Sequence, residues 1–184
     1  MNYAQIREMD ISNSPNFSVS LWVSGCKFAC PHCFNKEQQD FNYGKPYDSD
    51  TENTILSLLD KDYIYSLEIL GGDPLCQNIE GLEQLIQLCE KTHKLSKKIW
   101  LWSGYTWEEL EKNFNEYQYT PFAPNADEWF LRWELINLCD VFVDGRFEYD
   151  KRDSNLYYKG SSNQRVIDVK QTLSTHTLTL YQPE

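Results

Sequence analysis

Three cysteines, Cys26, Cys30 and Cys33, lie within a segment of eight residues, and their type and spacing indicate a chemical role. With six cysteines in 184 residues, an average window of that length would hold fewer than one. Three thiols cannot all pair with one another as disulfides, and thiolates are preferred ligands of zinc and of iron–sulfur centres. Spacings of four and three residues let one tight loop aim all three sulfurs inward. The cluster therefore predicts metal binding or redox chemistry.

The number of thiols indicates which type of metal centre the loop could hold. A 4Fe–4S cluster ordinarily takes four cysteines, so three in this loop would leave one iron open to an outside ligand. Open coordination positions are typical of catalytic metal sites. Two alternatives stay open: the three cysteines with His32 would form a structural zinc site, and Cys76 would close the cluster for plain electron transfer.

Strand-like and helix-like patterns alternate along the chain, and these elements must position the cysteine loop. Strands are predicted over residues 18–24, 66–70, 98–102, 141–143, 164–169 and 177–181. Helices are predicted from Asp48 or Ser49 onward, after Asn78, over 107–114, and through 129–136. Cys89 falls on the apolar stripe of its helix and Cys139 adjoins a buried strand, so both are expected to pack in the core.

Alternating strands and helices imply an α/β fold with a mostly parallel sheet and right-handed crossovers. The chain is too short for the ~250 residues of eight βα units, so we infer an incomplete TIM-type βα barrel. A single domain, 1–184, is expected, with an insertion near 115–127 and a C-terminal extension over 170–184.

Unusual segments stand at the carboxyl ends of four predicted strands: residues 25–33, 71–74, 103–106 and 144–147. In a parallel sheet these ends share one rim, where active sites collect. The sequence therefore predicts one site built from four loops.

The C-x3-C-x2-C loop after one strand and Gly71-Gly72-Asp73-Pro74 after the next resemble the radical S-adenosylmethionine (SAM) superfamily. More narrowly, the chain resembles the activating proteins of anaerobic, class III ribonucleotide reductase. The segments that carry this resemblance are residues 23–26, 33–35, 71–75, 102–106, 143–147 and 160–164, within a span from about 3 to 169. Two features depart from the pattern. His32 stands just before the third cysteine, where many members of the superfamily have an aromatic residue. The segment over 117–125 and the tail after Val169 are longer than the corresponding parts of the family core.

The resemblance implies that the three cysteines hold three irons of a 4Fe–4S cluster, while the methionine part of SAM binds the fourth. Gly71 and Gly72 would let the backbone approach SAM closely, because they lack a Cβ. Asp73 would accept a charge-assisted hydrogen bond from the SAM ammonium group. His32 and Phe34 would pack near the adenine. Without this context, the glycines would be read as a β-turn and Asp73 as a helix cap.

Further residues of the rim are candidates for contact with SAM or with a partner protein, and they could equally brace the rim. They are Ser103, Tyr105, Asp144, Arg146, Ser161, Ser162, Asn163 and Gln164.

The implied activity is that of a radical SAM activase. The reduced cluster would cleave SAM to methionine and a 5′-deoxyadenosyl radical, which would take a hydrogen from a glycine of the reductase large subunit and leave a glycyl radical. Flavodoxin or ferredoxin would supply the electron, and no general acid or base is needed. The alternatives are another glycyl-radical-enzyme activase, a small radical SAM enzyme, and a non-catalytic zinc or iron–sulfur binding module.

Charge and hydropathy limit the remaining partners. Lys and Arg total 17 against 28 Asp and Glu, a net charge of −11, which counts against nucleic acid or an anionic membrane as the main partner. No apolar run approaches the ~20 residues of a spanning helix, and the N-terminus lacks the layout of a secretory signal. A cytoplasmic protein is expected.

Overall fold

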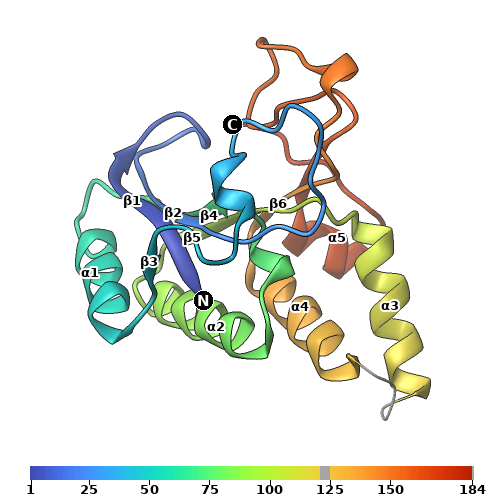
Figure 1. Cartoon of the computed structure of the whole chain (residues 1–184), viewed down its shortest axis with the longest axis horizontal. Helices are drawn as coiled ribbons and strands as arrows, with labels where there is room; N and C mark the ends of the chain where they lie inside the picture. The colour runs from blue at the N-terminus through green and yellow to red at the C-terminus, as the bar shows by residue number, and fades with distance from the viewer. Residues whose placement is uncertain (121–124, 184) are drawn as a thin grey trace.

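A mixed sheet forms the centre of the computed structural model, which describes residues 1–120 and 125–183 (Figure 1). In the described part of the chain the sheet has seven strands, in the order β3-β1-β2-β4-β5-β6-β7. They are β1 (Asn2–Asp10), β2 (Ser18–Val23), β3 (Lys45–Pro46), β4 (Ser66–Gly71), β5 (Lys98–Trp102), β6 (Val141–Asp144) and β7 (Arg165–Asp168). Strands β2, β4, β5 and β6 are parallel, whereas β1, β3 and β7 pair antiparallel with their neighbours.

Helices pack on one face of this sheet, and Figure 1 shows α1, α2 and α4 below it. The helices are α1 (Ser49–Leu59), α2 (Ile79–Lys94), α3 (Trp107–Tyr119), α4 (Ala126–Leu138) and α5 (Val169–Thr175), with short 3-10 turns η1 (Glu37–Gln39), η2 (Pro74–Cys76) and η3 (Tyr149–Lys151). Two helices begin with the expected N-cap. The Asp48 side chain accepts a hydrogen bond from Thr51 N–H at the start of α1, and the Asn78 side chain accepts one from Gly81 N–H at the start of α2. None of the helices in the described residues is long and apolar enough to cross a membrane.

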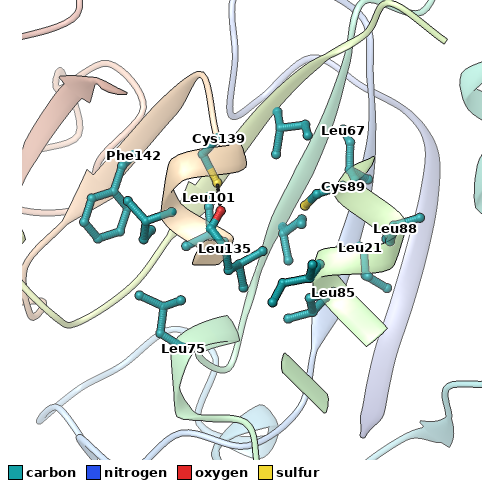
Figure 2. Packing of buried hydrophobic residues seen from close by; sticks show 14 of the residues in the cluster. Leu21, Leu67, Leu75, Leu85, Leu88, Cys89, Leu101, Leu135, Cys139 and Phe142 are labelled. Atoms are coloured by element: carbon teal, nitrogen blue, oxygen red, sulfur yellow. Dashed lines mark hydrogen bonds between the residues drawn. The ribbon is translucent and has the colours of Figure 1, made fainter. Parts of the chain in front are cut away.

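The core lies between the sheet and the helices. Alternate side chains of the central strands point to this side, and Figure 2 shows Leu21, Leu67 and Leu101 directed at residues of α2 and α4. Cys89 and Cys139 are fully buried in the same cluster, so their predicted packing role is confirmed. The opposite side of the sheet is covered by two long loops, residues 24–44 and 145–164 (Figure 1, light blue and orange).

The predicted parallel sheet is confirmed for its middle and corrected at both edges. Strand β1 was not predicted, because it has little β-rich character and is half-exposed, with β3 pairing only to its first residues, Asn2 and Tyr3. It must run antiparallel to β2, since the connection over residues 11–17 is too short for a crossover helix. At the other edge, β7 reverses direction beside β6.

Two local predictions also change. The strand over 177–181 is wrong: among the described residues, Leu180 forms only an isolated bridge with Ile167, and α5 occupies the start of the expected extension. Helix α3 continues to Tyr119, into the segment expected to be an insertion. Residues 121–124 of that segment lie outside the described residues.

Candidate iron–sulfur site

The cysteine loop is joined to the segment after β4 by backbone hydrogen bonds. Gly72 N–H donates to the Val23 carbonyl over 2.7 Å, and Asp73 N–H donates to the Gly25 carbonyl over 2.8 Å. Asn35 Nδ2 donates to the Gly71 carbonyl over 2.8 Å from the far end of the loop. The two motifs therefore form one unit at the carboxyl ends of β2 and β4.

Gly71 and Gly72 are required by this close approach. Gly71 has a φ of +106°, and a Cβ there would lie 2.7 Å from the Val23 carbonyl oxygen. A Cβ on Gly72 would lie 2.7 Å from the Gly25 carbonyl oxygen. Contacts under 3.0 Å to backbone demand that the backbone move. The glycine pair thus has a packing reason that is independent of any ligand.

The path of the cysteine loop depends on left-handed backbone at two residues that carry side chains. Ala29 has a φ of 47° and His32 a φ of 58°, a conformation that is uncommon for residues other than glycine, although asparagine, aspartate and histidine adopt it more readily than most. Cys33 N–H donates to the Cys30 carbonyl over 3.2 Å, closing a tight turn around His32. Strained backbone of this kind persists where surrounding contacts hold it, and it gathers at functional sites.

The loop's three cysteines are free thiols of intermediate exposure, and backbone N–H groups point at two of their sulfurs. Phe28 and Ala29 donate to Cys26, and Phe147, from the loop after β6, donates to Cys30. Burial raises the pKa of Cys30 in spite of the Phe147 contact.

Cys76 lies beside Cys26. The neighbouring Cys76 thiol lowers the pKa of Cys26, while Cys26 and burial raise the pKa of Cys76. Within the described residues, the sulfurs of Cys26 and Cys76 and a carboxylate oxygen of Asp73 form a group whose ligand atoms are all within 4.8 Å of one another. The sequence had offered Cys76 only as an alternative fourth ligand.

The buried Asp73 carboxylate connects the segment after β4 to the segment after β5 by hydrogen bonds. Oδ1 accepts from Leu75 N–H over 2.8 Å and Oδ2 from Gly104 N–H over 2.8 Å, while the Ser103 hydroxyl lies 2.9 and 3.0 Å from the two oxygens. Burial raises the pKa of Asp73 to about 6. A carboxylate has about four acceptor positions, and these three donors leave about one. The cap reading of Asp73 is confirmed at η2, with capacity for a further donor.

Aromatic and cationic side chains surround the cysteine loop. The Phe28 ring lies 4.8 Å from that of Tyr105 and 4.5 Å from the Arg146 guanidinium. His32 is exposed, with its ring 4.4 Å from that of Tyr149. Phe34, 76% exposed, makes an edge contact with Phe147 and lies under Arg152. The loop over 145–164 therefore packs directly against the cysteine loop.

Other rim candidates make contacts within the protein. Asp144 is 1% exposed and accepts from Trp107 N–H and from Arg165 Nε, over 2.9 and 3.0 Å. Arg146 also pairs with Glu109 at 3.0 Å.

The run over 161–164 closes the long loop on itself. Asn163 Nδ2 donates to the Arg146 carbonyl and Gln164 Nε2 to the Gly145 carbonyl, each over 2.8 Å. Ser161 is buried, and exposed Ser162 donates its N–H to the Lys151 carbonyl. These contacts match the bracing role that the sequence left open.

Arg132 on α4 is a buried residue that sequence reasoning missed. It is 2% exposed, its Nε donates to the Leu75 carbonyl over 2.7 Å, and its guanidinium lies 4.5 Å from the Trp129 ring. Arg132 therefore holds η2 in place. The i,i+3 spacing of Trp129 and Arg132 was the available signal for a cation–π pair on one helix face.

The donor set of this loop fits an iron–sulfur cluster. It offers three unpaired thiols on one loop, with backbone N–H groups directed at the sulfurs of Cys26 and Cys30. Thiolate ligands select zinc, copper(I) or iron–sulfur centres, and hydrogen bonds to the sulfurs are among the features that tune such clusters.

A family-model match defines the class of protein to which the chain belongs. Residues 13–167 match the family model described as a 4Fe-4S single cluster domain, which covers most of the chain and all of the site.

Similar proteins then narrow the class. The chain is 34% identical over 170 residues to the anaerobic ribonucleoside-triphosphate reductase-activating protein of Salmonella typhi, covering 90% of this chain and 97% of that protein. It is 35% identical over 169 residues to the protein of that name from Escherichia coli, with the same coverage, and 35% identical over 170 residues to that of Pasteurella multocida. The chain belongs to the family of anaerobic ribonucleoside-triphosphate reductase-activating proteins.

Proposed function

We propose that this chain is a radical SAM activase that generates the glycyl radical on the large subunit of anaerobic ribonucleotide reductase. The observation that carries the proposal is the three-thiol loop joined by backbone hydrogen bonds to Gly72 and Asp73. Membership of the activating-protein family supports the choice of target. Flavodoxin or ferredoxin is the proposed electron donor.

Cys26, Cys30 and Cys33 would hold the cluster. Once bound, it supplies the electron for reductive cleavage of SAM and so the radical chemistry of the activase. The chain's own work is to bind, orient and exclude water, as in other enzymes whose cofactor carries the chemistry.

Asp73 is the residue proposed to orient SAM. Its remaining acceptor position suits one hydrogen of the SAM ammonium group, and a hydrogen bond between two charged groups is stronger than a neutral one. Ser103 and Gly104 fix the direction of the carboxylate. The Gly71–Gly72 backbone would lie against the same end of SAM.

The aromatic residues beside the cysteine loop are proposed to receive the adenine and the partner. His32 and Phe34 are exposed next to the loop, so they are available to a ligand or to the glycyl segment of the reductase. The main role of the other rim residues would be to hold these aromatic side chains and the cysteine loop in place. These residues are Ser103, Tyr105, Arg146 and 161–164.

We further propose that residues 1–184 form one domain, built as an incomplete βα barrel of the radical SAM kind. Helices on one side of four parallel strands and loops on the other support this proposal (Figure 1).

The test is anaerobic incubation of the iron- and sulfide-reconstituted chain with SAM, dithionite and the candidate reductase, followed by electron paramagnetic resonance. A glycyl-radical signal on the reductase, absent without SAM, is expected. About four irons with labile sulfide per chain would agree with the proposal, whereas one zinc per chain without sulfide would replace it by a binding module.

A further inference from the structure

Cys76 is a buried thiol next to the proposed cluster ligand Cys26. It is 1% exposed, and its sulfur lies within 4.8 Å of the Cys26 sulfur. Neither the three-cysteine motif nor the Gly71–Pro74 motif includes it. Its place beside a ligand sulfur therefore needs a reason of its own.

The protein holds Cys76 in this place from several sides. Cys76 ends the η2 turn and donates its own N–H to the Asp73 carbonyl over 3.1 Å. Arg132 binds the carbonyl of the preceding Leu75. The following residue, Gln77, donates its Nε2 to the Ser24 carbonyl over 3.0 Å, next to the start of the cysteine loop. These contacts fix the backbone on both sides of Cys76, and burial keeps its side chain on the side of the cysteine loop.

Cys76 is badly placed to be a fourth cluster ligand. Each iron of a 4Fe–4S cluster takes one cysteine, so ligand sulfurs spread around the cluster. The Cys76 sulfur instead lies within 4.8 Å of the sulfur of Cys26 itself. The Asp73 carboxylate within 4.8 Å also disfavours a second negative charge there.

We propose that the Cys76 thiol donates an S–H···S hydrogen bond to Cys26 and thereby raises the reduction potential of the cluster. Reduction adds negative charge that the sulfurs share, and a hydrogen bond to a sulfur stabilises that charge. Cys76 is thus a positioning residue that acts through Cys26. The inference rests on the proposed cluster, but it involves neither SAM nor the reductase.

The experiment is a redox titration of the reconstituted full chain without SAM, followed by electron paramagnetic resonance. A hydrogen bond contributes ~0.5–1.5 kcal/mol net, so Cys76→Ala should lower the ratio of reduced to oxidised cluster by about two- to thirteenfold at a given potential. This change in the ratio corresponds to a midpoint about 20–65 mV more negative, at ~59 mV per tenfold. Cys76→Ser keeps a donor and should recover part of the shift. Cys89→Ala, which removes another buried thiol outside the site, should leave the midpoint unchanged.

Equal midpoints for the wild type and Cys76→Ala, with both chains holding the same iron and sulfide, would overturn the inference alone. Loss of the cluster from both Cys76→Ala and Cys76→Ser, in chains that keep the wild-type circular dichroism, would also overturn it, because Cys76 would then be a ligand. Failure of the wild type to assemble any cluster would instead overturn the proposed function.

Discussion

Replacing Asp73 by Asn should destabilise the chain even when no SAM is present. The carboxylate accepts from Leu75 N–H, Gly104 N–H and the Ser103 hydroxyl, and so ties the segment after β4 to the segment after β5. Asn has one oxygen where Asp has two. Whichever way the amide is turned, its NH2 group faces one of the two backbone N–H groups.

The expected loss follows from this count. A hydrogen bond to a charged acceptor contributes ~1.5–3 kcal/mol, and its loss leaves a backbone N–H without its acceptor. Part of the loss is offset, because burial raises the pKa of Asp73 to about 6 and a neutral Asn avoids the cost of burying charge. The net loss should be about 1–2 kcal/mol at pH 7.

The assay is urea unfolding of the reduced chain, followed by tryptophan fluorescence. Asp48→Asn is the matched control, since Asp48 is an exposed N-cap at α1 and Asn caps nearly as well as Asp. That variant should stay within about 0.5 kcal/mol of the wild type. An Asp73→Asn variant as stable as the wild type would refute the bracing argument.

The same variant tests the proposed SAM contact separately. If the remaining acceptor position of Asp73 takes the SAM ammonium, loss of that charge-assisted bond should weaken SAM binding to the reconstituted protein about 10- to 150-fold. The cluster should still assemble, because Asp73 is not a proposed ligand. A change below about threefold, against the ~1.5–3 kcal/mol expected, would limit Asp73 to bracing.

Three further predictions address the cluster and the rim. Cys30→Ala should abolish cluster assembly while Cys89→Ala leaves it intact, as measured by iron and sulfide content; a normal cluster in Cys30→Ala would remove the ligand assignment. SAM added to the reduced protein should change its electron paramagnetic resonance spectrum, and an unchanged spectrum at saturation would indicate a closed cluster. Arg165 binds both Glu108 oxygens, at 2.8 and 2.7 Å, and lowers the pKa of Glu108 to about 2. Because the folded-state pKa is lowered, the stabilisation is present above the unfolded pKa of ~4.3 and is lost as pH falls toward 2. Glu108→Gln should therefore reduce the free energy of unfolding by about 0.5–1 kcal/mol at pH 7, a figure discounted for exposure, and by less at pH 3; an equal effect at both pH values would contradict it.

Local pattern was sufficient for the elements that face the core. Helix α2 was expected from the spacing of its apolar residues after Asn78, and it begins there. Strand β5 was expected over 98–102 and has those bounds. Burial on a fixed face leaves a 3.6- or 2-residue period, which the sequence displays directly.

The same periodic pattern did not predict the elements toward the two ends of the sheet. Strand β1 is half-exposed along most of its length, so no buried face imposes a period on it. The direction of β7 depends on how the loop over 145–164 returns to the sheet, which no local pattern encodes. Helix α5 has only seven residues, too few for a clear period.

The loop of three thiols and its place at the end of a strand could be predicted from the sequence alone, because residue type and spacing within one loop are local properties. It also determined that Gly71, Gly72 and Asp73 follow the neighbouring strand. The tertiary structure was needed to show that the Asp73 carboxylate accepts from Ser103 and Gly104, and that the Cys76 sulfur lies within 4.8 Å of the Cys26 sulfur. Those contacts join segments far apart in the chain, and which side chains meet there depends on strand order and loop packing.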